Sequence, residues 1–172
     1  MNILLRLAGV NVNIYPGSVT ATVKQKIMEE AKKIACVIID QNIEELNMLS
    51  QSIWNNPELA FNEHYAHNLL TDYLEKCGFQ VEKSFTLPTA FKATFCHGDN
   101  KNGANIAMLC EYDALPGIGH ACGHNLIAEV GIAASVAVKA AMVSTNQIFG
   151  KVKLLTHLNI TLFSIDTIHH MI

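Results

Sequence analysis

The segment from Ile106 to Ala128 constrains this chain more than any other stretch. It opens with a short apolar run, continues with two acids at alternate positions, Glu111 and Asp113, and then turns through one proline and two glycines. Two histidines and a cysteine follow within five residues, and an alanine-rich apolar segment comes next. Because open α/β sheets bind ligands beyond the carboxyl ends of their strands, this order predicts a strand, a ligand-binding loop and a helix.

Composition restricts the class of protein. The 172 residues are enough for one domain, and because half of them are apolar, the chain can bury a core. The net charge is -3 without a basic cluster, which argues against a nucleic acid or an anionic membrane as partner. No uninterrupted apolar run reaches the ~20 residues of a bilayer-crossing helix. The five cysteines are scattered without a CxxC pair, so we expect reduced thiols and a cytoplasmic location.

The helices are expected in three places. Apolar residues recur at helical spacing from about Val23 to Ile53, with a break near Asp40, and again from Glu63 to Lys76. Gly78 follows the second run, where a C-cap glycine is typical. A third helix, apolar and well buried, is expected from about His124 to Met142.

The strands complete the expected fold. Short strands are expected at 80–85 and 90–95, and a longer one at 105–111. Because the longer strand is apolar at consecutive positions, we expect it at the centre of the sheet with both faces covered. A strand at 150–155 after the third helix predicts a parallel crossover. The pattern therefore predicts an α/β fold of three layers, in which helices flank a mixed, mostly parallel sheet.

The domain boundaries follow from changes in character along the chain. Residues 1–20 form an apolar leader without the pattern of a signal peptide, and residues 21–155 form the folded domain. Residues 156–172 differ from the rest, and we expect a divergent tail there.

Cys122 and His124 are the candidate metal ligands. They are two positions apart in an irregular loop, and a thiolate with an imidazole suits Zn²⁺. Asp113 and Glu111 lie upstream, where they could orient an imidazole from behind. Spacing alone leaves two alternatives: a buried structural thiol with histidines that cap the helix, or a Cys122 nucleophile activated by His120 or His124.

Two further histidines, His64 and His67, are three residues apart in the expected second helix. That spacing would allow both to contact one metal ion. Because no acid or cysteine accompanies them at matching spacing, we expect two exposed polar side chains instead.

Residues 111–125, EYDALPGIGHACGHN, and residues 56–79, NPELAFNEHYAHNLLTDYLEKCGF, resemble the amidohydrolase branch of the aminoacylase/carboxypeptidase family of zinc metallopeptidases. The resemblance runs from about residue 43 to 155 and is strongest to the aminoacylase-like dipeptidases. It implies hydrolysis of dipeptides or N-acyl amino acids with one or two divalent metals.

The resemblance also implies roles for single residues. Cys122 and His124 match metal ligands of the family, and Cys122 takes the place of a carboxylate that bridges two metals in other members. Asp113 matches the catalytic acid that supports the site from behind. His120 belongs to the motif without an implied ligand role, and Asn125 stands where many members have Asp.

The chain departs from the family pattern after the last expected strand. There the family has a Pro-Ala-Glu-Glu loop with a general base and a further ligand, but this chain reads Thr156-His157-Leu158-Asn159, and no Glu follows Glu129. The distal histidine ligands and the lid domain, through which members often form homodimers, also lie beyond this sequence.

We therefore expect a truncated catalytic domain that hydrolyses dipeptides or N-acyl amino acids weakly, with loosely held Zn²⁺ or another divalent metal. One alternative is a non-catalytic fragment that binds full-length relatives. A small metal-binding module is another.

Overall fold

The computed structural model describes residues 21–98 and 103–156. Its elements are α1 (Ala21–Gln41), α2 (Ile43–Asn55), α3 (His64–Lys76), β1 (Gln80–Lys83), β2 (Phe91–His97), β3 (Ala104–Cys110), α4 (His124–Thr145) and β4 (Gly150–Thr156). The expected break in the first helical run is confirmed, and it falls at Asn42, whose side-chain amide donates to the carbonyl of Ile38. The predicted leader and nearly all of the predicted tail lie outside the described residues, but Thr156, expected to begin the tail, ends β4.

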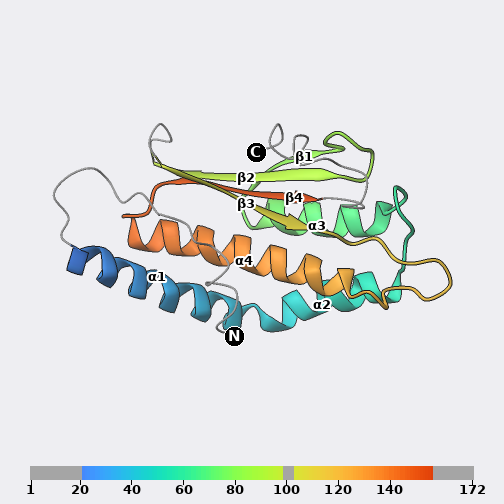
Figure 1. Cartoon of the computed structure of the whole chain (residues 1–172), viewed down its shortest axis with the longest axis horizontal. Coiled ribbons are helices and arrows are strands. Elements are labelled where there is room, and N and C mark those ends of the chain that lie inside the picture. The colour runs from blue at the N-terminus through green and yellow to red at the C-terminus, as the bar shows by residue number, and fades with distance from the viewer. Residues whose placement is uncertain (1–20, 99–102, 157–172) are drawn as a thin grey trace.

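The strand order is β1-β2-β4-β3 (Figure 1). β3 and β4 are parallel and connected through α4, so the α/β class, the mixed sheet and the crossover are confirmed. The other two pairings among the described strands, β1 with β2 and β2 with β4, are antiparallel. The expectation of a mostly parallel sheet is therefore wrong for this part of the chain, because β2 runs antiparallel to both of its neighbours, β1 and β4.

β3 was expected at the centre of the sheet, but it is an edge strand among the described residues. The reason is that β4 pairs between β2 and β3 and takes the central place. Cys110 is fully buried against the helices, whereas Leu109, on the opposite face, is 42% exposed. Consecutive apolar residues therefore did not mean burial on both faces here.

The described helices lie on one face of the sheet (Figure 1). α3 and α4 contact the strands directly, and α1 and α2 pack on the outer side of α4. The core joins Leu70 of α3, Phe91 of β2, Ile132 of α4 and Leu154 of β4. The described part therefore has three layers, as expected: the sheet, then α3 and α4, then α1 and α2. The sheet is an outer layer, however, and does not lie between helices.

α4 is apolar around most of its circumference. By length and composition alone it could cross a membrane, although its apolar residues do not form one uninterrupted run. In the structure α4 lies between the sheet and α1, a position that requires apolar residues on opposite sides of a helix. The expected burial is confirmed for side chains such as Ile132 and Ala141, but Leu126 and Val143 are exposed.

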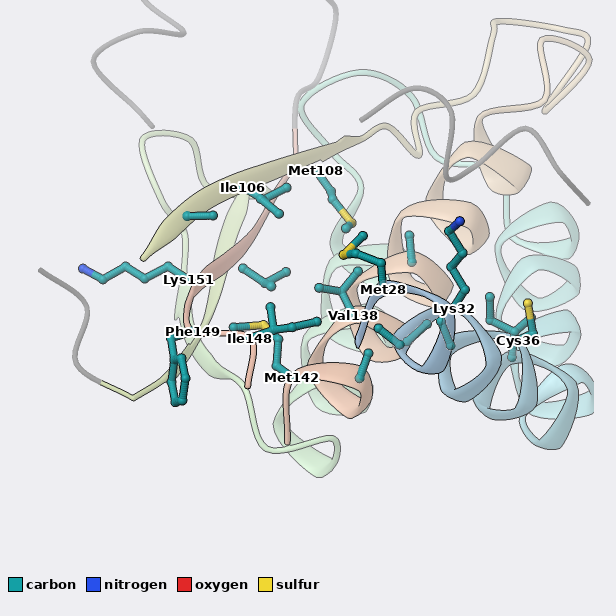
Figure 2. A pocket seen from close by; sticks show the side chains of 18 of the residues that line it. Met28, Lys32, Cys36, Ile106, Met108, Val138, Met142, Ile148, Phe149 and Lys151 are labelled. Atoms are coloured by element: carbon teal, nitrogen blue, oxygen red, sulfur yellow. The ribbon is translucent and has the colours of Figure 1, made fainter. Parts of the chain in front are cut away.

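An apolar cavity of about 230 Å³ lies between α1, α4 and the sheet (Figure 2). Met28, Met108 and Val138 are among its lining residues, and Lys32 and Lys151 are among the few charged ones. The β3 residues in the lining are Ala104, Ile106 and Met108, so the cavity lies toward the beginning of that strand. It is therefore separate from the loop that follows the strand's end.

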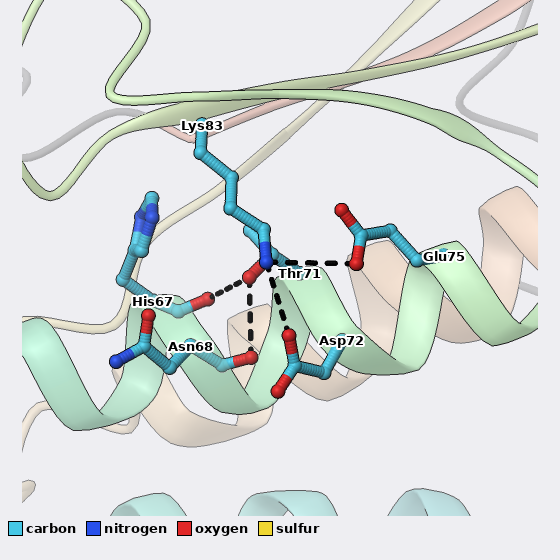
Figure 3. A network of polar contacts seen from close by, with 6 residues as sticks. All are labelled: His67, Asn68, Thr71, Asp72, Glu75 and Lys83. Atoms are coloured by element: carbon cyan, nitrogen blue, oxygen red, sulfur yellow. Dashed lines mark hydrogen bonds and ion pairs between the residues drawn. The ribbon is translucent and has the colours of Figure 1, made fainter.

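α3 is joined to β1 by a charged contact (Figure 3). Lys83 Nζ lies 3.0 Å from Asp72 Oδ1 and 3.5 Å from Glu75 Oε2. Since all three side chains are well exposed to solvent, this network contributes little to stability. The helix ends where the sequence predicted, and Gly78, at φ 75°, is the expected C-cap glycine.

One expectation for α3 is wrong. His64 is exposed, but His67 is only 6% exposed and its Nδ1 lies 3.0 Å from the carbonyl oxygen of Thr89. Burial lowers the pKa of His67, which favours the neutral ring. The two histidines therefore point into different environments and do not share a site.

Candidate metal-binding site

Two acidic side chains stand where β3 ends. Glu111 is 8% and Asp113 7% exposed, and Tyr112 between them is fully buried. Alternation of side chains along an extended backbone accounts for this arrangement, since it places the two carboxylates on one side and the phenol on the other. The sequence predicted both acids near the site, and the structure confirms their place at the end of the strand.

His124, the first residue of α4, lies between these carboxylates. Its Nδ1 is 2.8 Å from Asp113 Oδ1 and 3.0 Å from the backbone carbonyl oxygen of Asp113. Both neighbours of Nδ1 are acceptors, so Nδ1 carries a proton and donates it. When the ring is neutral, Nε2 is then the nitrogen with the free lone pair.

The second ring nitrogen faces Glu111. His124 Nε2 lies 3.2 Å from Glu111 Oε2. A neutral Nε2 and a carboxylate are both acceptors, so a proton or a metal ion between them would satisfy both. In a tetrahedral site with bonds of about 2.0–2.1 Å, two ligand atoms lie ~3.3 Å apart. This pair therefore fits a divalent cation in spacing and in donor chemistry.

The structure brings together only part of the predicted site. His124, Asp113 and Glu111 are in contact, whereas Cys122 is exposed and free. No group of three or more His, Cys, Asp or Glu side chains within residues 21–98 and 103–156 is arranged to hold a metal ion. Because Cys122 is exposed, the alternative of a buried structural thiol is wrong.

Glu111 is the residue whose place sequence reasoning missed. We expected it to orient an imidazole from behind, but Asp113 alone contacts Nδ1 of His124, and Glu111 contacts the other ring nitrogen, Nε2. The alternation of Glu111 with Asp113 was the available signal, since it puts both acids on the same side of the backbone.

His120 is a buried residue of the loop itself, with 2% exposure. Neither of its ring nitrogens has a hydrogen-bond partner among the described residues. Burial lowers the pKa of His120, as does the nearby His124, and both effects favour the neutral ring. It precedes α4 and does not cap it, because Gly123 occupies the N-cap position.

Known structures share this fold. A dinuclear metal-binding peptidase of the M20 family from Bacillus subtilis matches 67% of this chain and 34% of its own, with a TM-score of 0.56 and 22% identity. A protein from methicillin-resistant Staphylococcus aureus matches 78% of this chain with a TM-score of 0.54. The fold is therefore that of part of an M20-type peptidase domain.

Sequence comparison makes the relationship more specific. No family model matches the chain. A Xaa-Arg dipeptidase from Mus musculus is 47% identical over 124 residues, and the Homo sapiens protein of that name is 44% identical over 125. A p-aminobenzoyl-glutamate hydrolase component from Escherichia coli is 32% identical over 130 residues. Over the matched part, the chain is homologous to these M20 family peptidases, as the sequence motifs predicted.

The homology covers a limited part of the relatives. The match to the mouse protein takes in 68% of this chain but only 29% of that protein's length. The chain therefore spans less than a third of the curated relatives it matches.

Proposed function

We propose that this chain supplies part of the active centre of a metal-dependent hydrolase of peptide or amide bonds. Its substrates in this proposal are dipeptides or N-acyl amino acids. The names of its homologues support that class: dipeptidases, carboxypeptidases and a hydrolase of an aminobenzoyl-glutamate amide. The free thiols of all five cysteines fit the cytoplasmic location that belongs to this proposal.

The orientation of His124 is the observation that carries the proposal. Asp113 holds the proton on Nδ1 and thereby leaves Nε2 free to bind a metal, 3.2 Å from a second potential ligand, Glu111. An imidazole oriented by a carboxylate is the usual arrangement of a metal-binding histidine. His124 and Cys122 would hold Zn²⁺ or another divalent metal, with Glu111 as an additional oxygen ligand.

A bound divalent ion would act as a Lewis acid toward the carbonyl of the bond to be cleaved. This chain's own residues have simpler tasks. Asp113 fixes the tautomer of His124, and the burial of both carboxylates keeps water away from that contact. His120 is buried within the loop itself, and burial lowers the pKa of its ring, which favours the neutral form.

Metal binding and hydrolysis by the purified chain test this proposal together. We expect weak binding of Zn²⁺, Mn²⁺ or Co²⁺, because the described residues cluster fewer ligands than a closed site needs. Binding should be lost in His124→Ala and reduced in Cys122→Ala. Slow hydrolysis is expected on a panel of dipeptides, including ones with a carboxyl-terminal arginine, and of N-acetyl amino acids.

The controls separate the outcomes. Cys96→Ala removes an exposed thiol outside the loop and should leave metal binding unchanged. Binding that survives in His124→Ala would contradict the assigned ligand. If neither metal binding nor metal-stimulated hydrolysis is detected in the wild-type chain, the proposed function is wrong for this chain.

A further inference from the structure

The turn from Pro57 to Glu63 contacts the site through the backbone of Glu58. The carbonyl oxygen of Glu58 accepts a hydrogen bond of 2.7 Å from the N–H of Ala114, the residue after Asp113. Leu59 and Ala114 form an isolated parallel β-bridge at the same place. The turn is therefore bonded directly to the segment that carries the two acids.

The side chain of Glu58 makes a separate contact, with the start of α3. Its carboxylate oxygens accept hydrogen bonds from the N–H groups of Tyr65 at 2.8 Å and Ala66 at 3.0 Å. The first N–H groups of a helix have no partner within the helix, and a negative charge is favourable there. Glu58 thus anchors the turn to α3, whose inner face is part of the core.

A second connection runs through the buried carboxyl of Glu63. This side chain is completely buried, and it accepts hydrogen bonds from the N–H of Phe61 at 2.7 Å and from Thr89 Oγ1 at 2.6 Å. The carbonyl oxygen of Thr89 in turn accepts from the hydroxyl of Tyr112. The turn and the Tyr112 side chain are therefore held by the same residue, Thr89.

Both connections meet the backbone next to Asp113. Tyr112, one residue before it, is fixed by its hydroxyl and by stacking on Phe91, with ring centroids 6.3 Å apart. Ala114, one residue after it, is fixed by Glu58. Asp113 is thus held on both sides by hydrogen bonds that do not involve His124.

We propose that Glu58, Glu63 and Tyr112 are positioning residues that keep Asp113 against Nδ1 of His124 and Glu111 against Nε2. We call the segment 57–63 the clamp turn. The link to metal binding rests on the function proposed above, but the effect on the His124 tautomer does not. Anchoring on both sides leaves the carboxylate little freedom, and this is how supporting groups orient a metal ligand.

Two variants test the proposal, one at Tyr112 and one at Glu58 in the clamp turn, and each has a matched control. Tyr112→Phe removes one hydroxyl and keeps the stacked ring, and Tyr73→Phe makes the same change in another buried tyrosine, outside the clamp. Glu58→Ala removes the carboxylate from the start of α3, and Glu44→Ala removes one from the first turn of α2. Glu58→Gln keeps an acceptor at the helix start and serves as a conservative rescue.

The first measurement is the tautomer of His124 by ¹⁵N NMR at alkaline pH, assigned by its loss in His124→Gln. We expect the wild type and both controls to show one tautomer, with the proton on Nδ1. Tyr112→Phe and Glu58→Ala should show a mixture, and Glu58→Gln should lie closer to the wild type. The second measurement is Co²⁺ affinity, which should fall about 10-fold in the two clamp variants.

The outcomes are distinguishable. If Tyr112→Phe and Glu58→Ala keep a single tautomer and wild-type Co²⁺ affinity, the clamp proposal is wrong, even if their melting temperatures fall. A wild type that binds none of Zn²⁺, Mn²⁺ and Co²⁺ and shows no metal-stimulated hydrolysis would refute the proposed function, and the tautomer measurement would then decide the clamp proposal alone. If Glu58→Ala fails to fold, Tyr112→Phe and Glu58→Gln give the same test.

Discussion

At the scale of single residues, the contact between Asp113 and His124 decides which ring nitrogen can bind a metal. Asp113→Asn keeps the shape but offers an amide group that can also donate to Nδ1, so the fixed tautomer is lost. We expect zinc affinity to fall about 10- to 100-fold, with little change in the melting temperature. Isothermal titration calorimetry measures the affinity. Asp72→Asn, on the exposed face of α3, is the control and should bind zinc as the wild type does.

Glu63 gives a prediction about pH and stability. Burial raises its pKa above the ordinary value of 4.5, although the hydrogen bond from Thr89 opposes this. The folded protein therefore binds this proton more tightly than the unfolded chain does. The stability that results is fully present below pH 4.5 and is lost as the pH rises through the raised pKa.

Urea unfolding at a series of pH values measures this effect. The free energy of unfolding of the wild type should fall relative to that of Glu63→Gln as the pH rises above 4.5, and the difference should then level off. Glu30→Gln, an exposed carboxylate of α1, is the control for the general change in charge. A difference between wild type and Glu63→Gln that is independent of pH would refute the prediction.

The residues of the site were predictable where the chemistry is local. Asp113 and His124 belong to one motif, and the structure brings them into contact as expected. The burial of His67 was not predictable, because its partner, the carbonyl of Thr89, is 22 residues away in the sequence. The alternation of Glu111 with Asp113 puts both acids on one side of the backbone, but which ring nitrogen of His124 each acid contacts depends on how the loop folds back. The role of Cys122 stays a prediction.

At the scale of elements, the first residue of β4, Gly150, lies too close to β3 for any side chain. Gly150 has φ 145°, and a Cβ there would lie 2.1 Å from the carbonyl oxygen of Ala104 in β3. We expect Gly150→Ala to lower the free energy of unfolding by about 2–4 kcal/mol, from backbone strain and overlap together. Gly117→Ala is the control, because its φ is 77° but no atom lies within 4 Å.

Urea unfolding of both variants separates strain from overlap. Gly117→Ala should lower the free energy of unfolding by only ~1 kcal/mol, the effect of a positive φ alone. If both variants lose the same free energy of unfolding, a Cβ at Gly150 does not overlap with Ala104, and the prediction is wrong.

The elements themselves were largely predictable, whereas their arrangement was not. The breaks at Asn42 and after Asn55 follow from local signals, and the helices begin and end within a few residues of the expected places. The edge position of β3 could not be read from its sequence, since strand order depends on which strand returns beside it. Here α4 carries the chain to β4, which pairs with β3 on one side and β2 on the other.

At the scale of the whole molecule, one edge and one face of the sheet have no partner among the described helices and strands. β3 pairs on one side only, and the face of the sheet opposite the helices carries no described helix. Leu109 lies on that face at the open edge and is 42% exposed. Because β3 contains no charged residue or proline that would discourage pairing, the end of its edge around Leu109 favours association with another strand.

We therefore expect this chain to self-associate as its concentration rises. Leu109→Lys places a charge at the open edge and should shift the weight-average mass toward that of the monomer in sedimentation velocity experiments. Leu126→Lys introduces the same charge at an exposed position of α4 rather than on the sheet, and it should behave as the wild type does. If the wild type stays monomeric at every concentration, or if both variants reduce association equally, the edge of β3 is not the surface involved.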